Sequence, residues 1–294
     1  MSLFDRLADE ALRNLLGHAP LRAVVEKELL HHDILREMNA AGLLASLTFI
    51  GGTCLRACYG SSRLSEDLDF TGGADFTREA LASLGNILVK NLEAKYALQV
   101  RVAEPVKVSS GVDTWKLAVL THPGRRDLPP QRIHIDVCAI PSHDRRPMML
   151  RNPYGVDLGT SGLILQAQSR EEILADKFIA LAFRPNRIKN RDLWDIAWLK
   201  QQGVELPLPL IPLKIADHNQ TAADFAGELQ ARLSALNTDP AQRAAFVAEM
   251  RRFLPSRLAE KTIARGDYWT YLVNLLAEES RRILAKTPAA SRRG

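Results

Sequence analysis

The chain has 294 residues, of which 46% are hydrophobic and 25% are charged, and its formal net charge is +5. This length and composition allow a substantial core with room for two compact units, and they exclude a chain that is disordered throughout. Because we find neither a signal-peptide apolar block nor an apolar run long enough to span a membrane, we expect a cytoplasmic protein without a membrane partner.

The first predicted elements are two helices, over residues 5–16 and about 21–41. In the first helix, apolar residues recur every three or four positions, which is typical of a helix with one buried side. That side consists of Phe4, Leu7, Ala8, Ala11, Leu12, Leu15 and Leu16.

A glycine turn follows the apolar run over residues 47–50, which ends abruptly at Gly51 and Gly52. Such a stop is what a buried strand needs before a tight turn whose backbone amides can approach an anion. We expect Thr53 to cap a short helix, where its hydroxyl would add a hydrogen-bond donor to the exposed amides. The turn is therefore predicted to cradle a triphosphate.

A second strand is predicted beyond the loop over residues 60–63, and its alternation places Asp67 and Asp69 on one face. Two carboxylates about 7 Å apart along a strand can hold Mg²⁺ ions that bridge to substrate phosphates. A lone glycine pair is more often only a turn, and a lone D-x-D is more often surface charge. Their order, with a short helix and a basic loop between them, favours nucleotidyl transfer.

The two motifs carry a resemblance to a known family. G-G-T-x-L-R followed by R-x-S-x-D-L-D-F resembles the AbiEii/AbiGii toxin family, a branch of the DNA polymerase β-like nucleotidyltransferases, over roughly residues 20–200. The resemblance implies an α+β fold, with a polymerase β-like mixed sheet and flanking helices, followed by an α-helical carboxy-terminal domain. It also implies a nucleotide-binding set of Gly51, Gly52, Thr53, Arg56, Arg63, Ser65 and Arg184. Arg63 would neutralise phosphates, or pair with Glu66 or Asp67 to hold its loop.

After a helix over about residues 78–94, strand-like runs follow at residues 98–102, 115–121 and 132–140. In the last run, Ile133, Ile135 and Val137 alternate with His134, Asp136 and Cys138. A polymerase β-like site normally contains a third carboxylate on a neighbouring strand, so Asp136 is the candidate third metal ligand. The alternative is an amphipathic strand whose polar face meets only solvent.

Residues 171–183 have a helical pattern, and Lys177 and Arg184 project from nearly the same side, where two cations could meet triphosphate oxygens. A following helix carries Asp192 and Asp195 on a common face. From the residues alone, an ordinary helix pair joined by surface salt bridges is slightly favoured. The resemblance implies instead that Lys177 contacts nucleotide phosphates or helps activate the attacking hydroxyl, and that Asp192 or Asp195 positions it.

A proline-rich break at residues 206–212 precedes further helical segments at residues 222–236, 241–253 and 268–284. We therefore predict a catalytic domain with amino-terminal helices over residues 1–168. A helical domain over residues 169–294 would contribute Lys177 and the motif from Arg191 to Asp195.

The net charge indicates which partners the protein could bind, and the cysteines indicate the redox state of its compartment. The pI near 9.2 is a weak pointer towards RNA. Pairs of arginines could contribute to such a surface, although each pair is more often a solvated face: Arg125-Arg126, Arg145-Arg146, Arg251-Arg252, Arg281-Arg282 and Arg292-Arg293. Cys54, Cys58 and Cys138 fit no common zinc pattern and are interpreted as reduced thiols.

We predict a nucleotidyltransferase in which Asp67 and Asp69, with Asp136, bind Mg²⁺ or Mn²⁺ and orient an NTP for attack by an acceptor hydroxyl. The resemblance implies a toxin of a bacterial toxin–antitoxin or phage-defence pair, with an antitoxin partner and the 3′ end of tRNA as acceptor. Two alternatives stay open. One is transfer to a small molecule such as an aminoglycoside, or to a protein; the other is a catalytically silent module that binds RNA or a partner.

Overall fold

The computed structural model describes residues 2–15, 17–106, 111–125 and 127–286. The chain divides into two compact units, Met1–Gln168 and Ser169–Gly294, which we describe separately. Arg126 and the pair Arg292-Arg293 lie outside the described residues. No helix within those ranges is both long enough and apolar enough to cross a bilayer.

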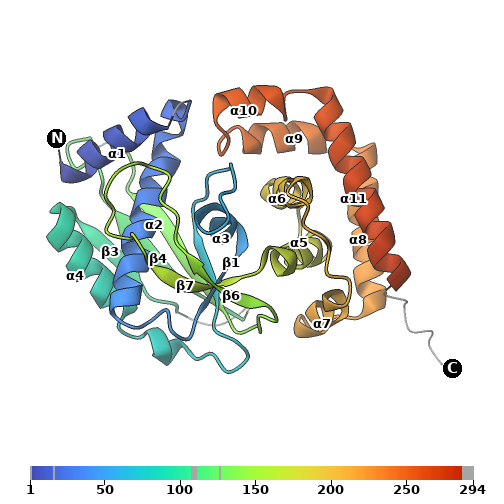
Figure 1. Ribbon diagram of the computed structural model, residues 1–294, viewed down its shortest axis with the longest axis horizontal. Helices are drawn as coiled ribbons and strands as arrows, with labels where there is room; N and C mark the ends of the chain where they lie inside the picture. The colour runs from blue at the N-terminus through green and yellow to red at the C-terminus, as the bar shows by residue number, and fades with distance from the viewer. Residues whose placement is uncertain (1, 16, 107–110, 126, 287–294) are drawn as a thin grey trace. The chain divides into compact units, whose positions relative to one another are not determined.

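The first unit is built on a mixed sheet with the strand order β3-β4-β5-β2-β1-β7-β6 (Figure 1). The pairs β1–β7 and β2–β5 are parallel, and the other neighbours are antiparallel. The strands are β1 Thr48–Ile50, β2 Leu68–Thr71, β3 Val100–Ala103, β4 Val112–Val119, β5 Gln131–Cys138, β6 Arg145–Met149 and β7 Ile164–Gln168. The predicted mixed sheet is confirmed.

Helices flank this sheet, as predicted. They are α1 Leu3–Asn14, α2 Arg22–Ala40, α3 Gly51–Ala57 and α4 Leu84–Tyr96, with 3₁₀ turns at Ala19–Leu21 and Arg78–Leu81. Helix α2 runs across one face of the sheet and packs on β5 and α4 (Figure 1). The core between the layers is apolar, with Leu29, Phe70 and Trp115 at most 1% exposed. Burial of such side chains is the main stabilising contribution to this layer arrangement.

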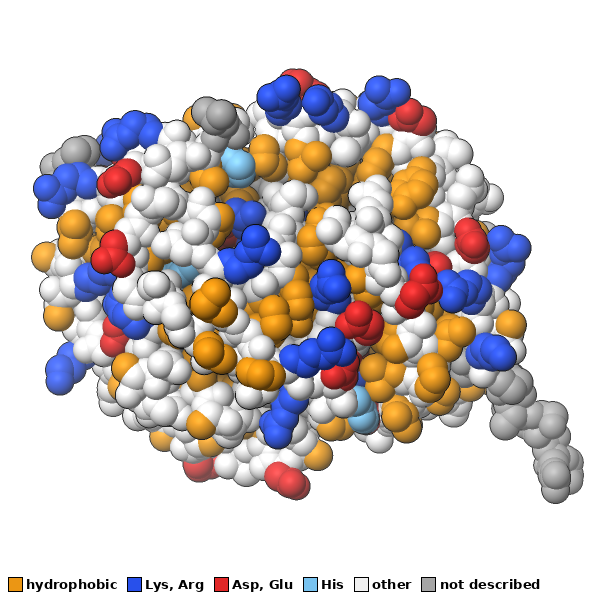
Figure 2. Space-filling view, in the orientation of Figure 1, with side chains coloured by type: hydrophobic (Ala, Val, Ile, Leu, Met, Phe, Trp, Pro, Cys, Tyr) orange, Lys and Arg blue, Asp and Glu red, His pale blue; other side chains and the backbone are white. Residues whose placement is uncertain are grey.

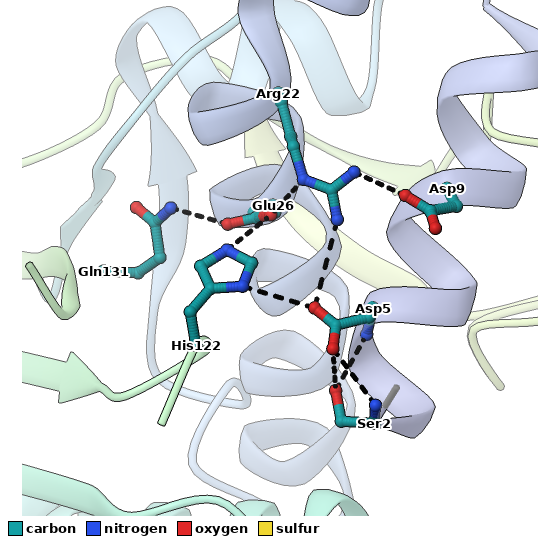
Figure 3. A network of polar contacts seen from close by, with 7 residues as sticks. All are labelled: Ser2, Asp5, Asp9, Arg22, Glu26, His122 and Gln131. Atoms are coloured by element: carbon teal, nitrogen blue, oxygen red, sulfur yellow. Dashed lines mark hydrogen bonds and ion pairs between the residues drawn. The ribbon is translucent and has the colours of Figure 1, made fainter. Parts of the chain in front are cut away.

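A polar network ties the start of α2 to α1 and to the sheet (Figure 3). The carboxylate of Glu26 is buried and accepts hydrogen bonds from Arg22 Nε at 2.9 Å and Gln131 Nε2 at 2.8 Å. His122 lies between that carboxylate, at 3.2 Å, and Asp5, at 3.3 Å. The buried charge of Glu26 is therefore fully partnered, which is the condition for tolerating it in a core.

The first unit differs from the predicted elements in three places. The single helix expected over residues 78–94 is a 3₁₀ turn followed by α4, because Arg78 is held by Asp113 Oδ1 at 2.6 Å and by the carbonyl of Pro105 at 2.9 Å. Strands β6 and β7 were not expected. Strand β6 has the exposed sequence RRPMM with an internal proline, a composition that sheets tolerate at an edge and that carries no alternating pattern.

The second unit is helical in its described part, as predicted. Its helices are α5 Arg170–Phe183, α6 Asn190–Gln201, α7 Leu210–Asp217, α8 Ala222–Thr238, α9 Pro240–Met250, α10 Ser256–Lys261 and α11 Gly266–Lys286. Helix α5 packs on α6, α7 and α8. The predicted proline-rich break is shorter than expected, because α7 begins at Leu210 and Pro212 lies in its first turn, where a missing amide hydrogen costs little.

Candidate active site

Two of the predicted carboxylates lie side by side on the sheet. Asp69 in β2 is the register partner of Asp136 in the parallel strand β5. Residues in register on neighbouring strands project from the same face, with the strands about 4.8 Å apart. The alternation expected for both strands is confirmed, because Leu68, Phe70 and their neighbours on β5 are buried while both aspartates are partly exposed. We call Asp69 and Asp136 the carboxylate pair.

Two neighbouring groups orient the predicted metal ligands. Thr114 in β4 is the register partner of Asp136, and its hydroxyl donates to Asp136 Oδ1 at 2.6 Å. Asp67 immediately precedes β2, and its Oδ1 accepts a hydrogen bond from the backbone amide of His134 at 3.0 Å. Hydrogen bonds of this kind fix the rotamer of a carboxylate before any substrate arrives. No sequence pattern indicates Thr114, because its role depends on strand pairing.

The chemistry of this donor set suits a hard divalent cation. Carboxylate oxygens are the ligands that Mg²⁺ and Mn²⁺ prefer, and the carboxylate pair offers them from adjacent strands. Among the described residues, no group of three or more His, Cys, Asp or Glu side chains is placed to hold a metal ion. Asp67 directs one oxygen to the amide of His134, so its predicted role as a ligand alongside the pair stays a prediction.

The glycine turn lies against these carboxylates. Gly51 has φ +75°, and a Cβ placed on it would lie 2.9 Å from Asp69 Oδ2. A Cβ on Gly52 would overlap the guanidinium of Arg63. Each glycine therefore allows a charged side chain to approach the backbone closely, and Gly51 also adopts a conformation that favours glycine. The turn and the carboxylate pair form one local structure.

Helix α3 begins at Gly51 with Ile50 as its N-cap, so the expectation that Thr53 caps this helix is wrong. Thr53 is buried inside the first turns of the helix, where its hydroxyl shares a hydrogen bond of 2.6 Å with the Ser65 hydroxyl. It also donates to the carbonyl oxygen of Asp67. Thr53 and Ser65 thus join α3 to the residue before β2, and their predicted nucleotide contact stays a prediction.

A buried glutamate in α2 organises the arginine side of the site. Glu28 is 3% exposed and accepts hydrogen bonds from Arg56 Nε at 3.2 Å, the Ser65 amide at 2.8 Å and the Tyr154 hydroxyl. Burial raises the pKa of Tyr154 well above its ordinary value, and the charge of Glu28 adds to this, so the phenol remains a donor. Sequence reasoning missed both Glu28 and Tyr154.

The two predicted nucleotide-binding arginines are mostly buried. Arg56 pairs with Glu28 and also donates to the Ser61 carbonyl at 3.0 Å. Arg63 is 2% exposed, and its Nη1 donates to the Leu64 carbonyl at 3.1 Å. Glu66 and Asp67 are the suggested partners of Arg63. The structure shows the carboxylate of Glu66 in an ion pair with Lys27 at 2.9 Å. Arg63 therefore places positive charge against the glycine turn, whereas the charge of Arg56 is balanced by Glu28.

In the second unit, α5 and α6 bring together the other predicted residues. Lys177 Nζ lies 2.5 Å from Asp192 Oδ1 and 2.8 Å from Asp195 Oδ2, and Arg184 lies 3.3 Å from Asp192. We call these four residues the Lys177 cluster. The interpretation as a surface salt bridge is wrong, because the side chains of Lys177, Asp192 and Asp195 are 9%, 4% and 0% exposed.

Electrostatics in the Lys177 cluster follow from this burial. Burial alone would raise the pKa of Asp192, but the positive charges of Lys177, Lys189 and Arg184 outweigh it and hold the pKa below its ordinary value. Because both aspartates contact the lysine, the geometry does not distinguish Asp192 from Asp195 as the functional residue.

One known protein family matches most of the chain. The model of the family described as "Nucleotidyl transferase AbiEii toxin, Type IV TA system" matches residues 33–273. Two solved structures from Helicobacter pylori are similar. JHP933 is 16% identical with a TM-score of 0.45, over 88% of this chain and 97% of that one. A putative nucleotidyltransferase is 16% identical with a TM-score of 0.47, over 87% and 98%. No curated protein sequence matches.

Proposed function

The chain belongs to the AbiEii nucleotidyl transferase toxin family of type IV toxin–antitoxin systems, and from this premise we propose that it transfers an NMP from an NTP to an acceptor hydroxyl at the carboxylate pair, with pyrophosphate as the leaving group. The observation that carries the proposal is the register pairing of Asp69 with Asp136 beside Gly51. It places two acidic groups next to a glycine turn, the combination that phosphoryl transfer uses to hold and orient a triphosphate.

Asp69 and Asp136, joined by Asp67, would hold Mg²⁺ or Mn²⁺. A bound ion of this kind neutralises phosphate charge and lowers the pKa of an attacking hydroxyl. Thr114 limits rotation of the Asp136 carboxylate, and the amide of His134 limits that of Asp67. The chain's own contribution at these residues is orientation, which lowers the reorganisation needed during transfer.

The glycine turn would hold the β- and γ-phosphates of the NTP. The amides of Gly51 and Gly52 stand at the start of α3, and the guanidinium of Arg63 packs against Gly52. Backbone amides with an adjacent buried cation favour an anion at this position. Arg63 would therefore act through charge beneath the turn, and Arg56 would support it by anchoring α3 to Glu28.

Lys177 would supply positive charge to the nucleotide phosphates or help activate the attacking hydroxyl, as the family resemblance implies. Asp192 and Asp195 hold the ammonium group from two sides at 2.5 and 2.8 Å. Such contacts fix the position of the ammonium group. We therefore assign both aspartates to positioning of the lysine, and Arg184, whose side chain is 34% exposed, is the more accessible member of the Lys177 cluster.

We further propose that the acceptor is RNA, specifically the 3′ end of tRNA, and that the protein is a cytoplasmic toxin or phage-defence effector countered by an antitoxin. The charge distribution supports an RNA acceptor. Lys and Arg equal Asp and Glu in number over residues 1–168, so the whole formal net charge of +5 falls on residues 169–294. Excess positive charge attracts a nucleic-acid backbone.

The test incubates purified protein with Mg²⁺, each α-labelled NTP in turn, and total bacterial RNA. We expect label in RNA of tRNA size from the wild type, and none from Asp69→Asn or Asp136→Asn. Asp127→Asn is the matched control, because Asp127 is an exposed carboxylate that pairs with Arg125. Label that appears only with proteins or aminoglycosides would move the acceptor to another class. Absence of label with every acceptor would overturn enzymatic transfer and favour a silent binding module.

A further inference from the structure

A groove of about 670 Å³ opens on the surface of the second unit, between α8, α9 and α11. Its floor is the face of α9 formed by Ala244, Val247 and Ala248, and Trp269 of α11 forms part of one wall. We call it the α9 groove. Its volume falls within the usual range for sites that bind small organic groups, and its floor is made of short side chains that leave room for a flat partner.

Two arginines mark the ends of this floor. Arg243 in α9 and Arg251, the C-cap residue of that helix, are both exposed and lie eight residues apart, about 12 Å along the helix axis. Within the described ranges neither side chain forms an ion pair, whereas nearby cations are engaged: Arg265 pairs with Asp267 at 2.9 Å, and Arg252 lies over the ring of Phe253. The α9 groove therefore has two unneutralised guanidinium groups at a fixed spacing.

Asp239, the acidic residue that lines the groove, forms hydrogen bonds within the protein. Asp239 caps α9, where its carboxylate accepts hydrogen bonds from the amide of Ala241 at 2.9 Å and from Gln242 Nε2 at 3.0 Å. The helix start stabilises this negative charge. What the groove offers to a ligand is consequently positive charge from Arg243 and Arg251.

Trp269 adds an aromatic surface. Its side chain is half-buried, and its ring packs against Phe246 with ring centroids 5.5 Å apart. The Phe246 ring is itself buried and fixes the indole from the inner side. An indole that is anchored in this way can stack with a second flat group without losing much conformational freedom.

We propose that the α9 groove binds a single-stranded RNA segment, with one base stacked on Trp269 and phosphates at Arg243 and Arg251. Single-strand sites combine aromatic stacking with cations that follow the backbone, which is the combination present here. An apolar helix of a partner protein would suit the alanine floor but would leave both guanidinium groups unneutralised. Arginine also matches phosphate oxygens through two parallel hydrogen bonds. The inference rests on the proposed function only for the identity of RNA as acceptor.

The experiment measures binding of a fluorescent single-stranded RNA 12-mer by anisotropy, with full-length Asp69→Asn protein so that no transfer occurs. We expect Trp269→Ala to weaken binding about 10-fold, and Trp269→Phe to retain most of the affinity because it can still stack. Arg243→Ala/Arg251→Ala should weaken binding and reduce the salt slope by about 1.4, the value for two released phosphate contacts on a single strand. Thermal melting confirms that each variant is folded.

Arg257→Ala/Lys261→Ala is the matched control, because it removes two exposed cations from α10 outside the groove. Groove variants that bind like the wild type, or a control that loses as much affinity as they do, would overturn the proposal. The two proposals fail separately. Loss of RNA binding in the groove variants, without label transfer by the wild type, would contradict the proposed function alone. Label transfer by the wild type, with unchanged binding in the groove variants, would contradict the groove alone.

Discussion

At the scale of single residues, Thr114 is a positioning residue for the proposed reaction. Its hydroxyl holds Asp136 Oδ1 at 2.6 Å from the neighbouring strand. We expect Thr114→Val to lower kcat about 10-fold and to raise the Mg²⁺ concentration needed for half-maximal rate, because outer contacts of this kind orient metal ligands. Thr114→Ser, which keeps the hydroxyl, should restore both values. Equal Mg²⁺ dependence in the valine and wild-type proteins would contradict this role.

Gly51 is the subject of a second prediction at this scale. Its substitution tests the effect of backbone strain on stability separately from the effect of displacing Asp69 on the rate. Gly51→Ala should lower the free energy of unfolding by about 1–3 kcal/mol through its positive φ, and should also displace Asp69 and lower the rate at least 10-fold.

Gly73→Ala is the matched control, since Gly73 has φ +82° but a Cβ there would meet nothing within 4 Å. It should reproduce the loss of stability, measured by urea unfolding, while leaving the transfer rate of the folded protein nearly unchanged. If both variants lose activity to the same degree, close approach to Asp69 is not the reason that residue 51 is glycine.

The buried side chain of His32 in α2 is expected to make the free energy of unfolding depend on pH. Burial, and then the positive charges of neighbouring groups, lower the pKa of His32 to about 3. Because this folded-state value lies below the unfolded value of about 6.5, its contribution to stability is complete above pH 6.5 and is lost as the pH falls towards 3. We expect protonation linkage at His32 to remove about 2 kcal/mol of the free energy of unfolding at pH 5.

The measurement compares urea unfolding at pH 7.5 and pH 5 in the wild type and in His32→Gln, which can still bond to the Thr160 hydroxyl that His32 contacts at 2.8 Å. The glutamine variant should lose less stability between the two pH values. His218→Gln, at an exposed position, should behave like the wild type. An identical pH dependence in all three proteins would show that His32 is not the titrating group.

At the scale of elements, alternation predicted the exposed and buried faces of β2 and β5 correctly, because one face of each strand packs on the core. The pairing of Asp69 with Asp136 could be expected only in outline, since parallel register joins residues far apart in the chain. Thr114 could not be found at all, because it touches the site only after β4 has paired with β5. Edge strand β6 has no pattern that distinguishes it from a loop.

The pair of helices α5 and α6 shows the same limit. Sequence spacing placed Lys177, Asp192 and Asp195 on helix faces but assigned them to solvent, and only packing shows that they are buried. Removal of Lys177 would take away the cation that contacts both buried carboxylates, and within the Lys177 cluster only the contact of Asp192 with Arg184 at 3.3 Å would remain. We therefore expect Lys177→Met to lower the free energy of unfolding by about 3 kcal/mol.

Hydrogen exchange provides the measurement, since protection should fall in α5 and α6 of the Lys177→Met protein. Lys177→Arg keeps the charge and should retain most of the stability, whatever its effect on transfer. A methionine variant that is as stable as the wild type, yet inactive, would assign the lysine to chemistry alone.

At the scale of the whole molecule, the carboxylate pair lies in residues 1–168, and the excess positive charge falls on residues 169–294. This division predicts that salt affects RNA capture and NMP transfer differently. Space-filling representation shows Lys and Arg side chains interspersed with acidic ones on the face in view, rather than one continuous basic field (Figure 2). We expect the attraction of RNA to come from a few discrete contacts, whose number the salt slope reports.

We expect an increase in KCl from 50 to 200 mM to lower kcat/KM for RNA about 10-fold, the effect of releasing about two or three phosphate contacts on a single strand. At saturating RNA, kcat should change less than about twofold, because chemistry at buried and partly buried groups is screened little by salt. Steady-state rates across a KCl series, with NTP and Mg²⁺ held saturating, test both expectations. If kcat falls as steeply as kcat/KM, salt acts on the transfer step itself, and the expectation that salt weakens mainly RNA capture is wrong.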